Sequence, residues 1–324
     1  MNSPPLPVKI TVITTLLNEG DNLNGLMASV LQQTRKPEEM VVVDGGSTDG
    51  TLEKLAQWKP KFETADIVLK LAQAKGANIA RGRNLAVERA SHEWIAGIDG
   101  GCVAEKTWLE QMAKKAEESH ADVVSGNFRA TAETFPEKIQ GVFARISARD
   151  NPSSRSVMFR KKIWKKAGGY PEKLYTGEDT LFNARMKEAG AKFVFAPGAM
   201  VNWKMRTTLK KWLKQFYLYG YGDGRAGVKL NTWYGRKVGV LVAGLYGWMV
   251  ASSFFPVLLV LPWLAGAVYG LYRQFSMAGL VGGLLYPFRL LVFLAGLHFG
   301  WLERVRKQSM TQPLSKPESG RKKQ

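Results

Sequence analysis

Two acidic side chains each follow an apolar run that is typical of a buried strand. Asp44 comes directly after MVVV and before two glycines, and Asp99 comes after WIAGI and before two more. Two arginines, Arg81 and Arg83, lie between them in the chain. Carboxylates accept hydrogen bonds from ribose hydroxyls or from a base, and the guanidinium group binds phosphate oxygens through paired N–H groups. These residue types therefore suit a ligand that combines a nucleoside with a diphosphate.

Alternating strand and helix patterns would position these side chains. Such a series argues for an α/β fold with a mainly parallel sheet flanked by helices, whose ligands bind outside the carboxyl ends of the strands. Asp44 and Asp99 would then lie at one edge of the sheet. Taken alone, the turn after Asp44 could equally be structural, with Ser47 and Asp49 capping the next helix. The patterns predict strands at 9–15, 40–44, 66–72, 93–99 and 121–128 and helices at 22–33, 50–58, 82–90 and 107–119.

Four motifs occur in the same order as in the family 2 glycosyltransferases, and the chain resembles that family from about residue 8 to 227. The motifs are TTLLNE at 14–19, VVVDGGSTDGT at 41–51, ARGRN at 80–84 and YTGEDTLFNARMKEAGAKFVFAP at 175–197. In the first motif, Thr15 and Leu17 replace the Pro and Tyr of the family. The resemblance implies the GT-A fold, a Rossmann-like domain that binds a nucleotide sugar.

The resemblance also implies roles for particular side chains. Asp44 would contact the nucleotide base, and Arg83 would lie near the diphosphate. Asp179 would take the proton of the acceptor hydroxyl, and Glu178 would orient Asp179 or the acceptor. With no second carboxylate marked as a nucleophile, inversion at the anomeric carbon is expected. The full set implied at the nucleotide sugar is Thr15, Leu17, Glu19, Asp44, Ser47, Asp49, Arg83, Asp99 and Gly100.

An alternative exists for the acidic pair. On the pattern alone, Glu178 and Asp179 could be helix N-terminal carboxylates that the helix dipole favours.

One departure from the family concerns the metal ion. The family usually has Asp-x-Asp, whose second Asp holds Mg²⁺ or Mn²⁺, whereas this chain has Gly101 at that position. Asn202 or Trp203 stands where the family often has a His. A hard divalent cation prefers several oxygen ligands, so we expect a cation at Asp99 to be bound weakly or not at all. The diphosphate could instead be neutralised by Arg83, Arg206, Lys210 or Arg225.

The segment 207–227 predicts a basic, aromatic, amphipathic helix of the interfacial kind. Related membrane transferases carry a Gln-x-x-Arg-Trp motif here that helps to bind the acceptor. This chain keeps Gln215 but lacks the Arg-Trp pair. A helix that only anchors the domain to lipid is an equal alternative. The residues implied at the acceptor or the diphosphate are Arg206, Gln215, Tyr219 and Arg225.

The last third of the chain is apolar enough to enter a bilayer. Residues 238–272 carry no charge, and 278–302 are interrupted only by Arg289, whereas about 20 apolar residues suffice to cross. Basic residues flank both ends, so the positive-inside rule predicts an even number of crossings, namely two. Pro256 and Pro262 could break the first run into a hairpin. Arg289 should face protein, snorkel to the surface or mark a helix that lies in the interface.

The distribution of charge favours a membrane over a nucleic acid as partner. The formal net charge is +19. Residues 1–128 hold 14 basic and 17 acidic side chains, a net charge of −3, whereas 129–237 hold 23 basic and eight acidic ones, a net charge of +15. The excess lies beside the apolar segments, so anionic lipid is the expected partner. The N-terminal MNSPPLPVKI lacks the apolar core of a signal peptide, so the first domain is expected in the cytoplasm.

These observations predict three regions. Residues 1–228 form a cytoplasmic GT-A domain, with a nucleotide-binding half at 8–99 and an acceptor half at 100–228. Residues 229–303 form a membrane region with two spans, at about 238–272 and 278–302, and 304–324 form a basic cytoplasmic tail. The expected location is the plasma (inner) membrane, crossed more than once.

The expected activity is that of a membrane-anchored, inverting glycosyltransferase of the hexosyltransferase type. It would move a sugar from a nucleotide sugar, with UDP as the nucleotide, to a lipid-linked or envelope glycan acceptor in polysaccharide biosynthesis. The competing interpretation is a catalytically degenerate scaffold that binds nucleotide or lipid during polysaccharide assembly, since Gly101 leaves the metal motif incomplete.

Overall fold

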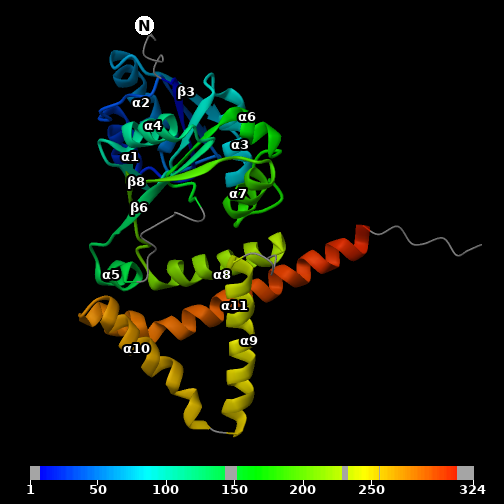
Figure 1. The fold of residues 1–324 in the computed structure, drawn as a ribbon. Helices are drawn as coiled ribbons and strands as arrows, with labels where there is room; N and C mark the ends of the chain where they lie inside the picture. The colour runs from blue at the N-terminus through cyan, green and yellow to red at the C-terminus, as the bar shows by residue number, and fades with distance from the viewer. Residues whose placement is uncertain (1–7, 143–151, 228–232, 255, 312–324) are drawn as a thin grey trace, which may run out of the picture.

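The computed structural model describes residues 8–142, 152–227, 233–254 and 256–311 (Figure 1). Residues 312–324 of the predicted basic tail lie outside the described residues. Residues 143–151 of the predicted acceptor half lie outside them as well.

Eight strands form one mixed sheet in the order β3-β2-β1-β4-β7-β6-β8-β5. Pairing is parallel from β3 through β2 and β1 to β4, and again between β6 and β8. β7 runs antiparallel to β4 and β6, and β5 runs antiparallel to β8. The strands are β1 Ile10–Leu16, β2 Glu39–Asp44, β3 Val68–Gln73, β4 Trp94–Gly97, β5 Cys102–Ala104, β6 Val123–Thr131, β7 Val157–Arg160 and β8 Phe193–Lys204.

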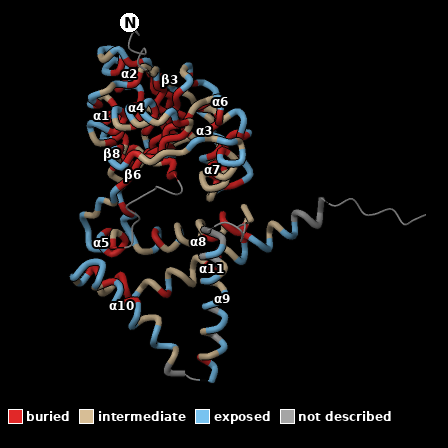
Figure 2. The backbone as a smooth tube through the Cα atoms, viewed as in Figure 1, coloured by how far each residue is buried: buried red, intermediate tan, exposed pale blue. Residues whose placement is uncertain are grey.

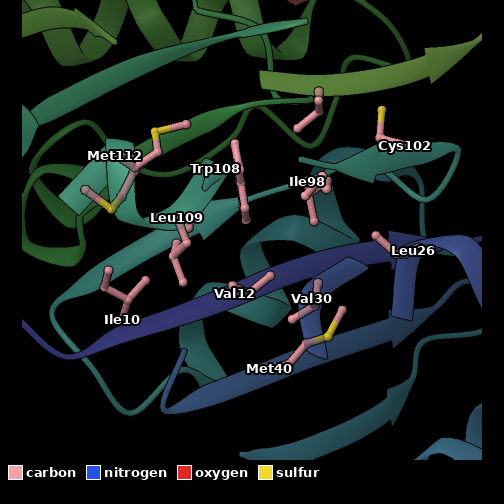
Figure 3. Close-up of a cluster of buried hydrophobic side chains, with 14 of the residues drawn as sticks. Ile10, Val12, Leu26, Val30, Met40, Ile98, Cys102, Trp108, Leu109 and Met112 are labelled. Atoms are coloured by element: carbon pink, nitrogen blue, oxygen red, sulfur yellow. The ribbon is translucent and has the colours of Figure 1, made fainter. Parts of the chain in front are cut away.

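Helices cover both faces of this sheet. Side chains of α1, α2 and α4 enter one buried cluster, shown in Figure 3, and side chains of α3, α6 and α7 enter a second cluster on the opposite face. The predicted α/β class, a sheet flanked by helices, is thus confirmed, with antiparallel strands inserted. The helices of this part are α1 Leu23–Leu31, α2 Thr51–Thr64, α3 Ile79–Arg89, α4 Trp108–Ser119, α5 Phe135–Gly141, α6 Lys161–Lys166, α7 Glu178–Glu188 and α8 Leu209–Ala226.

The strand β2 shows why the sequence forms these layers. Met40 and Val42 belong to the first cluster, whereas Val41 and Val43 belong to the second. Successive side chains of a strand point to opposite faces, and both faces are covered here. A continuous apolar run is therefore required, and it ends at Asp44 where the strand reaches the sheet edge.

The uncharged run 238–272 folds as a hairpin of two helices rather than one long helix. The elements are α9 Trp233–Phe254, the 3₁₀ turn η1 Pro256–Leu259 and α10 Leu261–Arg273. The indole N–H of Trp248 donates to the carbonyl oxygen of Leu258 at 2.8 Å and so ties α9 to the turn. In Figure 1, α9 leads away from the sheet domain and α10 returns toward it. The proline-induced break is therefore observed.

The last helix, α11 Met277–Thr311, contains the predicted second span. Its segment Met277–Arg306 has a mean hydropathy of 1.9 and is, among the described helices, the one long and apolar enough to cross a membrane. The apolar stretch of α9, Val242–Phe254, is shorter. The number of crossings therefore stays a prediction.

Glycines let α11 lie close to two other helices. A Cβ atom at any of them would collide with backbone atoms that face it. Such G-x-x-x-G contacts are typical of helices packed in membranes. Gly220 and Gly224 of α8 face the backbone of α11, Gly296 and Gly300 of α11 face the backbone of α8, and Gly266 and Gly270 of α10 lie against Gly279 and Gly283 of α11.

The charged residue within the apolar helix faces protein. The Arg289 guanidinium carbon lies 4.5 Å from the ring centroid of Phe216 and 5.9 Å from that of Trp212, both on α8. It also lies 4.4 Å from the ring of Tyr286 on its own helix. The first of the three predicted alternatives for Arg289 is therefore the one observed, and this cation fixes α11 to α8.

Candidate functional site

The strand β2 ends in a turn that its own carboxylate organises. Asp44 is 1% exposed and accepts hydrogen bonds from the backbone N–H groups of Gly46, at 2.8 Å, and Ser47, at 3.0 Å. The hydroxyl of Ser47 and, at 3.4 Å, the amide of Gln73 also donate to it. Gly46 has a φ of 102°, a conformation that favours glycine. In the described chain, Asp44 therefore shapes the turn, and its contact with a base stays a prediction.

The second acidic residue of this motif joins two loops. Asp49 accepts hydrogen bonds from the backbone N–H of Gly20 at 3.0 Å and from the N–H and hydroxyl of Thr51 at the start of α2. The Thr51 hydroxyl and the Gly20 N–H hold the pKa of Asp49 below its ordinary value. Ser47 accepts from the N–H of Asn18 at 2.8 Å in the same way. The loops after β1 and β2 thus form one unit, which the sequence motifs did not predict.

Three other predicted residues of the donor side surround this unit. Thr15 of β1 packs against Gly82 of α3, where a Cβ would collide with the threonine side chain. Gly100 lies against Leu16 and the side chain of Glu19, and a Cβ would not fit there either. Leu17 is exposed. These positions lie near the ends of β1 and β4, so they border the sheet edge that the motifs predicted.

Arg83 of α3 is the centre of the site. Its side chain is buried, at 6% exposure. One terminal nitrogen donates to Glu178 at 2.6 Å and the other to Asp99 at 2.7 Å. The guanidinium carbon also lies 5.5 Å from the ring centroid of Tyr170. One cation therefore joins the segment after β4 to the first residue of α7.

The next residue of α3 holds the loop that leads to α7. The Asn84 side-chain oxygen accepts from the backbone N–H of Tyr170 at 2.8 Å and from the indole of Trp164 at 3.0 Å. Its amide donates to the Tyr170 carbonyl oxygen and to Glu172, both at 2.9 Å. The sequence motif ARGRN contains this residue, but no function had been assigned to it. Asn84 therefore positions the chain that carries Glu178.

The acidic pair Glu178 and Asp179 begins α7, after Gly177 with a φ of 76°. Glu178 is 7% exposed, whereas Asp179 is only partly buried. Burial and the adjacent Asp179 raise the pKa of the Glu178 carboxyl to about 7, and the ion pair with Arg83 opposes this shift. Glu178 is thus committed to Arg83, and Asp179 is the carboxylate that a substrate can reach more easily.

The residues at the family's metal position do not fit a divalent cation. Gly101 has no side chain, and Trp203, which pairs with Cys102 across β5 and β8, offers an indole ring. Asn202, the other residue considered for the family's His, pairs with Val103 and points to the opposite face of the sheet from Trp203. Asp99 is one carboxylate and is already paired with Arg83. Over the residues that the structure describes, no group of three or more His, Cys, Asp and Glu side chains could hold a metal ion. A hard cation requires more oxygen ligands than this position offers.

A half-buried arginine that the sequence motifs did not mark acts electrostatically on Asp99. Arg155 precedes β7, and its guanidinium carbon lies 3.9 Å from the ring centroid of Trp203. One terminal nitrogen donates to the hydroxyl of Tyr219 at 3.2 Å. Arg155 and Arg83 together hold the pKa of Asp99 below its ordinary value against the effect of burial.

The predicted acceptor residues divide into two groups. The Gln215 amide donates to the Tyr219 hydroxyl at 2.7 Å, and this hydroxyl contacts Arg155. Arg206 is exposed and also lowers the pKa of Asp99. These three residues face the site. Arg225, in contrast, forms an ion pair of 3.8 Å with Glu303 of α11 and so belongs to the contact between α8 and α11.

Two family models match the sequence. The one described as Glycosyl transferase family 2 matches residues 11–171, and the one described as Glycosyl transferase family group 2 matches residues 152–301. The fold, with its nucleotide-sugar motifs at one sheet edge, defines a glycosyltransferase. The chain belongs to glycosyltransferase family 2.

Curated relatives are glycosyltransferases as well. Glycosyltransferase AglE of Haloferax volcanii is 28% identical over 198 residues, which cover 58% of this chain and 64% of that protein. The putative teichuronic acid biosynthesis glycosyltransferase TuaG of Bacillus subtilis is 36% identical over 103 residues, 32% of this chain and 40% of that protein. The matched part thus spans less than two thirds of the length of either relative.

Solved structures share the fold over nearly the whole chain. The mannosyltransferase PcManGT from Pyrobaculum calidifontis, in complex with GDP-Man and Mn²⁺, has a TM-score of 0.58 at 16% identity, covering 94% of this chain and 89% of that one. TarS of S. aureus, in complex with UDP-GlcNAc, has a TM-score of 0.52 at 19% identity, covering 93% and 92%. The expected GT-A fold is confirmed.

Proposed function

We propose that this protein is an inverting, membrane-anchored glycosyltransferase that moves a sugar from a UDP-linked donor to a lipid-linked or envelope glycan acceptor. The observation that carries the proposal is the pairing of Arg83 with both Asp99 and Glu178. It gathers a cation and two carboxylates at one rim of the sheet, with Asp179 directly beside them. A sugar transfer needs such a cation for the diphosphate and a free carboxylate for the acceptor.

Asp179 acts as the general base. It takes the proton of the acceptor hydroxyl while that oxygen forms a bond to the anomeric carbon. The bond between the anomeric carbon and the diphosphate oxygen breaks, and the diphosphate leaves with the electron pair. One displacement inverts the configuration at the anomeric carbon. The partial exposure of Asp179, beside the buried Glu178, supports this division of roles.

Glu178 holds the donor-side cation in place. Its ion pair of 2.6 Å fixes one end of the Arg83 guanidinium group, while Asp99 fixes the other at 2.7 Å. A guanidinium group with two fixed nitrogens cannot rotate away from the sheet edge, so the rim beside Asp179 is already ordered when a donor binds.

The donor is proposed to carry UDP. TarS is solved with UDP-GlcNAc and PcManGT with GDP-Man. These two structures support a nucleotide sugar in general rather than UDP in particular. The donors to be tested therefore include both UDP-linked and GDP-linked sugars.

Exposed apolar side chains support the membrane anchor. Figure 2 shows exposed residues along much of α9 and α10, in contrast to the buried interior of the sheet domain. A surface of this kind requires a cover, and a bilayer provides one. Lys210, Lys211 and Lys214 are exposed on the adjoining α8 and suit anionic head groups. The large exposed side chains of the hairpin include Val240, Tyr246, Val250, Phe254, Leu261, Leu264, Val268, Tyr269 and Tyr272.

The test is donor hydrolysis by the full chain in detergent. UDP-linked and GDP-linked sugars are incubated with the native protein and with Asp179→Asn, and the released UDP or GDP is measured. Turnover by the native protein, with loss of about 10²- to 10⁴-fold in the variant and unchanged nucleotide binding, is expected for a general base. Glu188→Gln, at the opposite end of α7, is the control. Binding of nucleotide without turnover of any donor would indicate the scaffold instead.

A further inference from the structure

At the position where the family binds its metal ion, this chain carries residues that are not metal ligands. Gly101 directly precedes β5, and the first residue of that strand, Cys102, pairs with Trp203 of β8. The backbone N–H of Lys204 lies 3.5 Å from the carbonyl oxygen of Gly101. The two places where the family supplies ligands are therefore adjacent across the sheet. They carry a hydrogen atom and an indole ring instead of a carboxylate and an imidazole.

Arg155 occupies this neighbourhood. Its guanidinium group stacks on Trp203, at 3.9 Å, and lies 5.2 Å from the ring centroid of Phe128. One terminal nitrogen donates to the Ser153 hydroxyl at 2.9 Å and the other to the Tyr219 hydroxyl at 3.2 Å. The aromatic rings and hydroxyls orient the group, but they do not neutralise it.

The positive charge of Arg155 lacks a direct counter-ion. Within the described ranges, no carboxylate lies within 4.0 Å of its nitrogens, and its buried Nε–H has no hydrogen-bond partner. Burial alone would lower the pKa of this group, but Tyr219 and Asp99 outweigh burial and raise it. A charged guanidinium group without a counter-ion is costly in this half-buried place, and an anion at its terminal nitrogens removes that cost.

The topology of the sheet explains how Arg155 reaches the site. β7 runs antiparallel to β4, and Val157 pairs with Gly97, the last residue of β4. The residues before β7 therefore lie at the same edge as those after β4. This arrangement places Arg155 near Asp99, and each of the two side chains shifts the pKa of the other.

We propose that Arg155, held against Trp203, binds the diphosphate of the nucleotide sugar and stabilises the leaving group in the place of a divalent cation. This inference rests on the proposed function. As the bond between the anomeric carbon and the diphosphate oxygen breaks, negative charge grows on that oxygen, and a fixed guanidinium group stabilises it. Tyr219 and Gln215 of α8 are positioning residues, because they act through Arg155.

The first test measures binding in EDTA. Calorimetric titrations of UDP, GDP and their nucleosides are made with the native protein and with Arg155→Gln, in detergent. The variant should bind UDP or GDP about 10- to 100-fold more weakly than the native protein does. It should bind the nucleoside as tightly as the native protein does, and this binding would show that the variant is folded. Arg160→Gln is the control, because Arg160 stacks on Trp94 and pairs with Asp122 at the other end of β7.

The outcomes separate this inference from the proposed function. If the native protein binds neither UDP nor GDP, the proposed function fails. If it binds one and Arg155→Gln binds that nucleotide as tightly, only the role of Arg155 fails. Loss of native binding in EDTA, with recovery in Mn²⁺, would also overturn that role.

A second test restores a ligand. A Cβ atom at Gly101 would meet no atom of the described chain within 4 Å, so an aspartate can be placed there. The double variant Arg155→Gln with Gly101→Asp should regain binding of the diphosphate in Mn²⁺ but not in EDTA, whereas the native affinity should be the same in both. If the double variant binds the nucleoside diphosphate as tightly in EDTA as in Mn²⁺ and as tightly as the native protein, the loss in Arg155→Gln is not the loss of a cation, and the proposal is overturned.

Discussion

Arg83 and Glu178 are 95 positions apart in the sequence, yet they form an ion pair of 2.6 Å. The second terminal nitrogen of the same arginine pairs with Asp99 at 2.7 Å. One side chain of α3 therefore links the end of the parallel strands to the helix that carries the acidic pair. The carboxylates would repel each other without this cation, so the geometry of the rim depends on Arg83.

Replacing Arg83 tests this dependence. Arg83→Gln leaves the buried Glu178 and the half-buried Asp99 without a cation, and the free energy of unfolding should fall by about 3–5 kcal/mol. Arg83→Lys keeps a charge, but a lysine cannot fork to both carboxylates, so we expect a smaller loss of stability together with a strong loss of turnover. Thermal unfolding and donor hydrolysis measure the two effects. Arg89→Gln, exposed in the last turn of α3, is the control. Native activity in Arg83→Lys would argue against a forked contact.

Glu178 should make stability depend on pH. Its pKa is raised from 4.5 to about 7 by burial and by Asp179, so the folded protein binds more protons than the unfolded chain between these values. The contribution of this group is therefore fully present below pH 4.5 and is lost as the pH rises through 7.

The variant Glu178→Gln keeps an amide of similar shape without this titration. Between pH 5 and 8, the Tm of the native protein should fall more steeply than that of the variant. Glu188→Gln should retain the native slope. Equal slopes in all three proteins would mean that the carboxyl of Glu178 titrates in its ordinary range.

Much of this site follows from the sequence. The strands are buried on both faces, so their apolar runs are easy to recognise. Each run ends at the edge of the sheet, where a polar residue follows it. The motifs at 80–84 and 175–197 indicate Arg83 and Glu178, and the Asp-x-Asp position indicates Asp99; the fold brings these three residues together. Arg289 was also predicted to face protein as one alternative, and aromatic rings of α8 surround it.

The remainder depends on information that a local pattern does not carry. No local pattern shows that β7 runs antiparallel to β4, and it is this direction that brings the residues before β7, Arg155 among them, to the edge where Asp99 follows β4. The spacing of Gly220 and Gly224 is visible in the sequence, yet the helix that they face lies about 70 positions further on. Asp44 and Asp49 are expected at the nucleotide sugar, which stays a prediction; among the described residues, Asp44 organises its own turn and Asp49 joins two loops.

Charged substitutions in the hairpin should weaken membrane attachment. Val250 of α9 and Val268 of α10 are 62% and 69% exposed. A glutamate at either position would carry its charge into the hydrocarbon, at a cost of roughly 2.5–3.5 kcal/mol at the centre of a bilayer. Val250→Glu with Val268→Glu should move protein from floated vesicles to the supernatant. Val68→Glu, on a 57% exposed valine of β3, is the matched control. Equal flotation of all three proteins would place the hairpin outside the bilayer.

The close contact of α8 with α11 should depend on glycine. A Cβ at Gly220 would collide with the carbonyl oxygen of Phe293, whereas a Cβ at Gly247 of α9 would meet no described atom within 4 Å. Gly220→Leu should therefore separate the helices and lower the free energy of unfolding by at least the roughly 1–3 kcal/mol typical of overpacking. Gly247→Leu should be neutral or slightly stabilising, since leucine favours helix more than glycine does.

This substitution also tests whether the membrane-side helices support the site. Tyr219, which contacts Arg155, directly precedes Gly220 on α8. If α11 positions α8, Gly220→Leu should weaken binding of the nucleoside diphosphate more than binding of the nucleoside, whereas Gly247→Leu should change neither. A Gly220→Leu protein with the same Tm as the native protein would show that the two helices do not pack through this glycine. If Gly220→Leu is less stable but binds the nucleotide as the native protein does, then α11 stabilises the fold without positioning the nucleotide site.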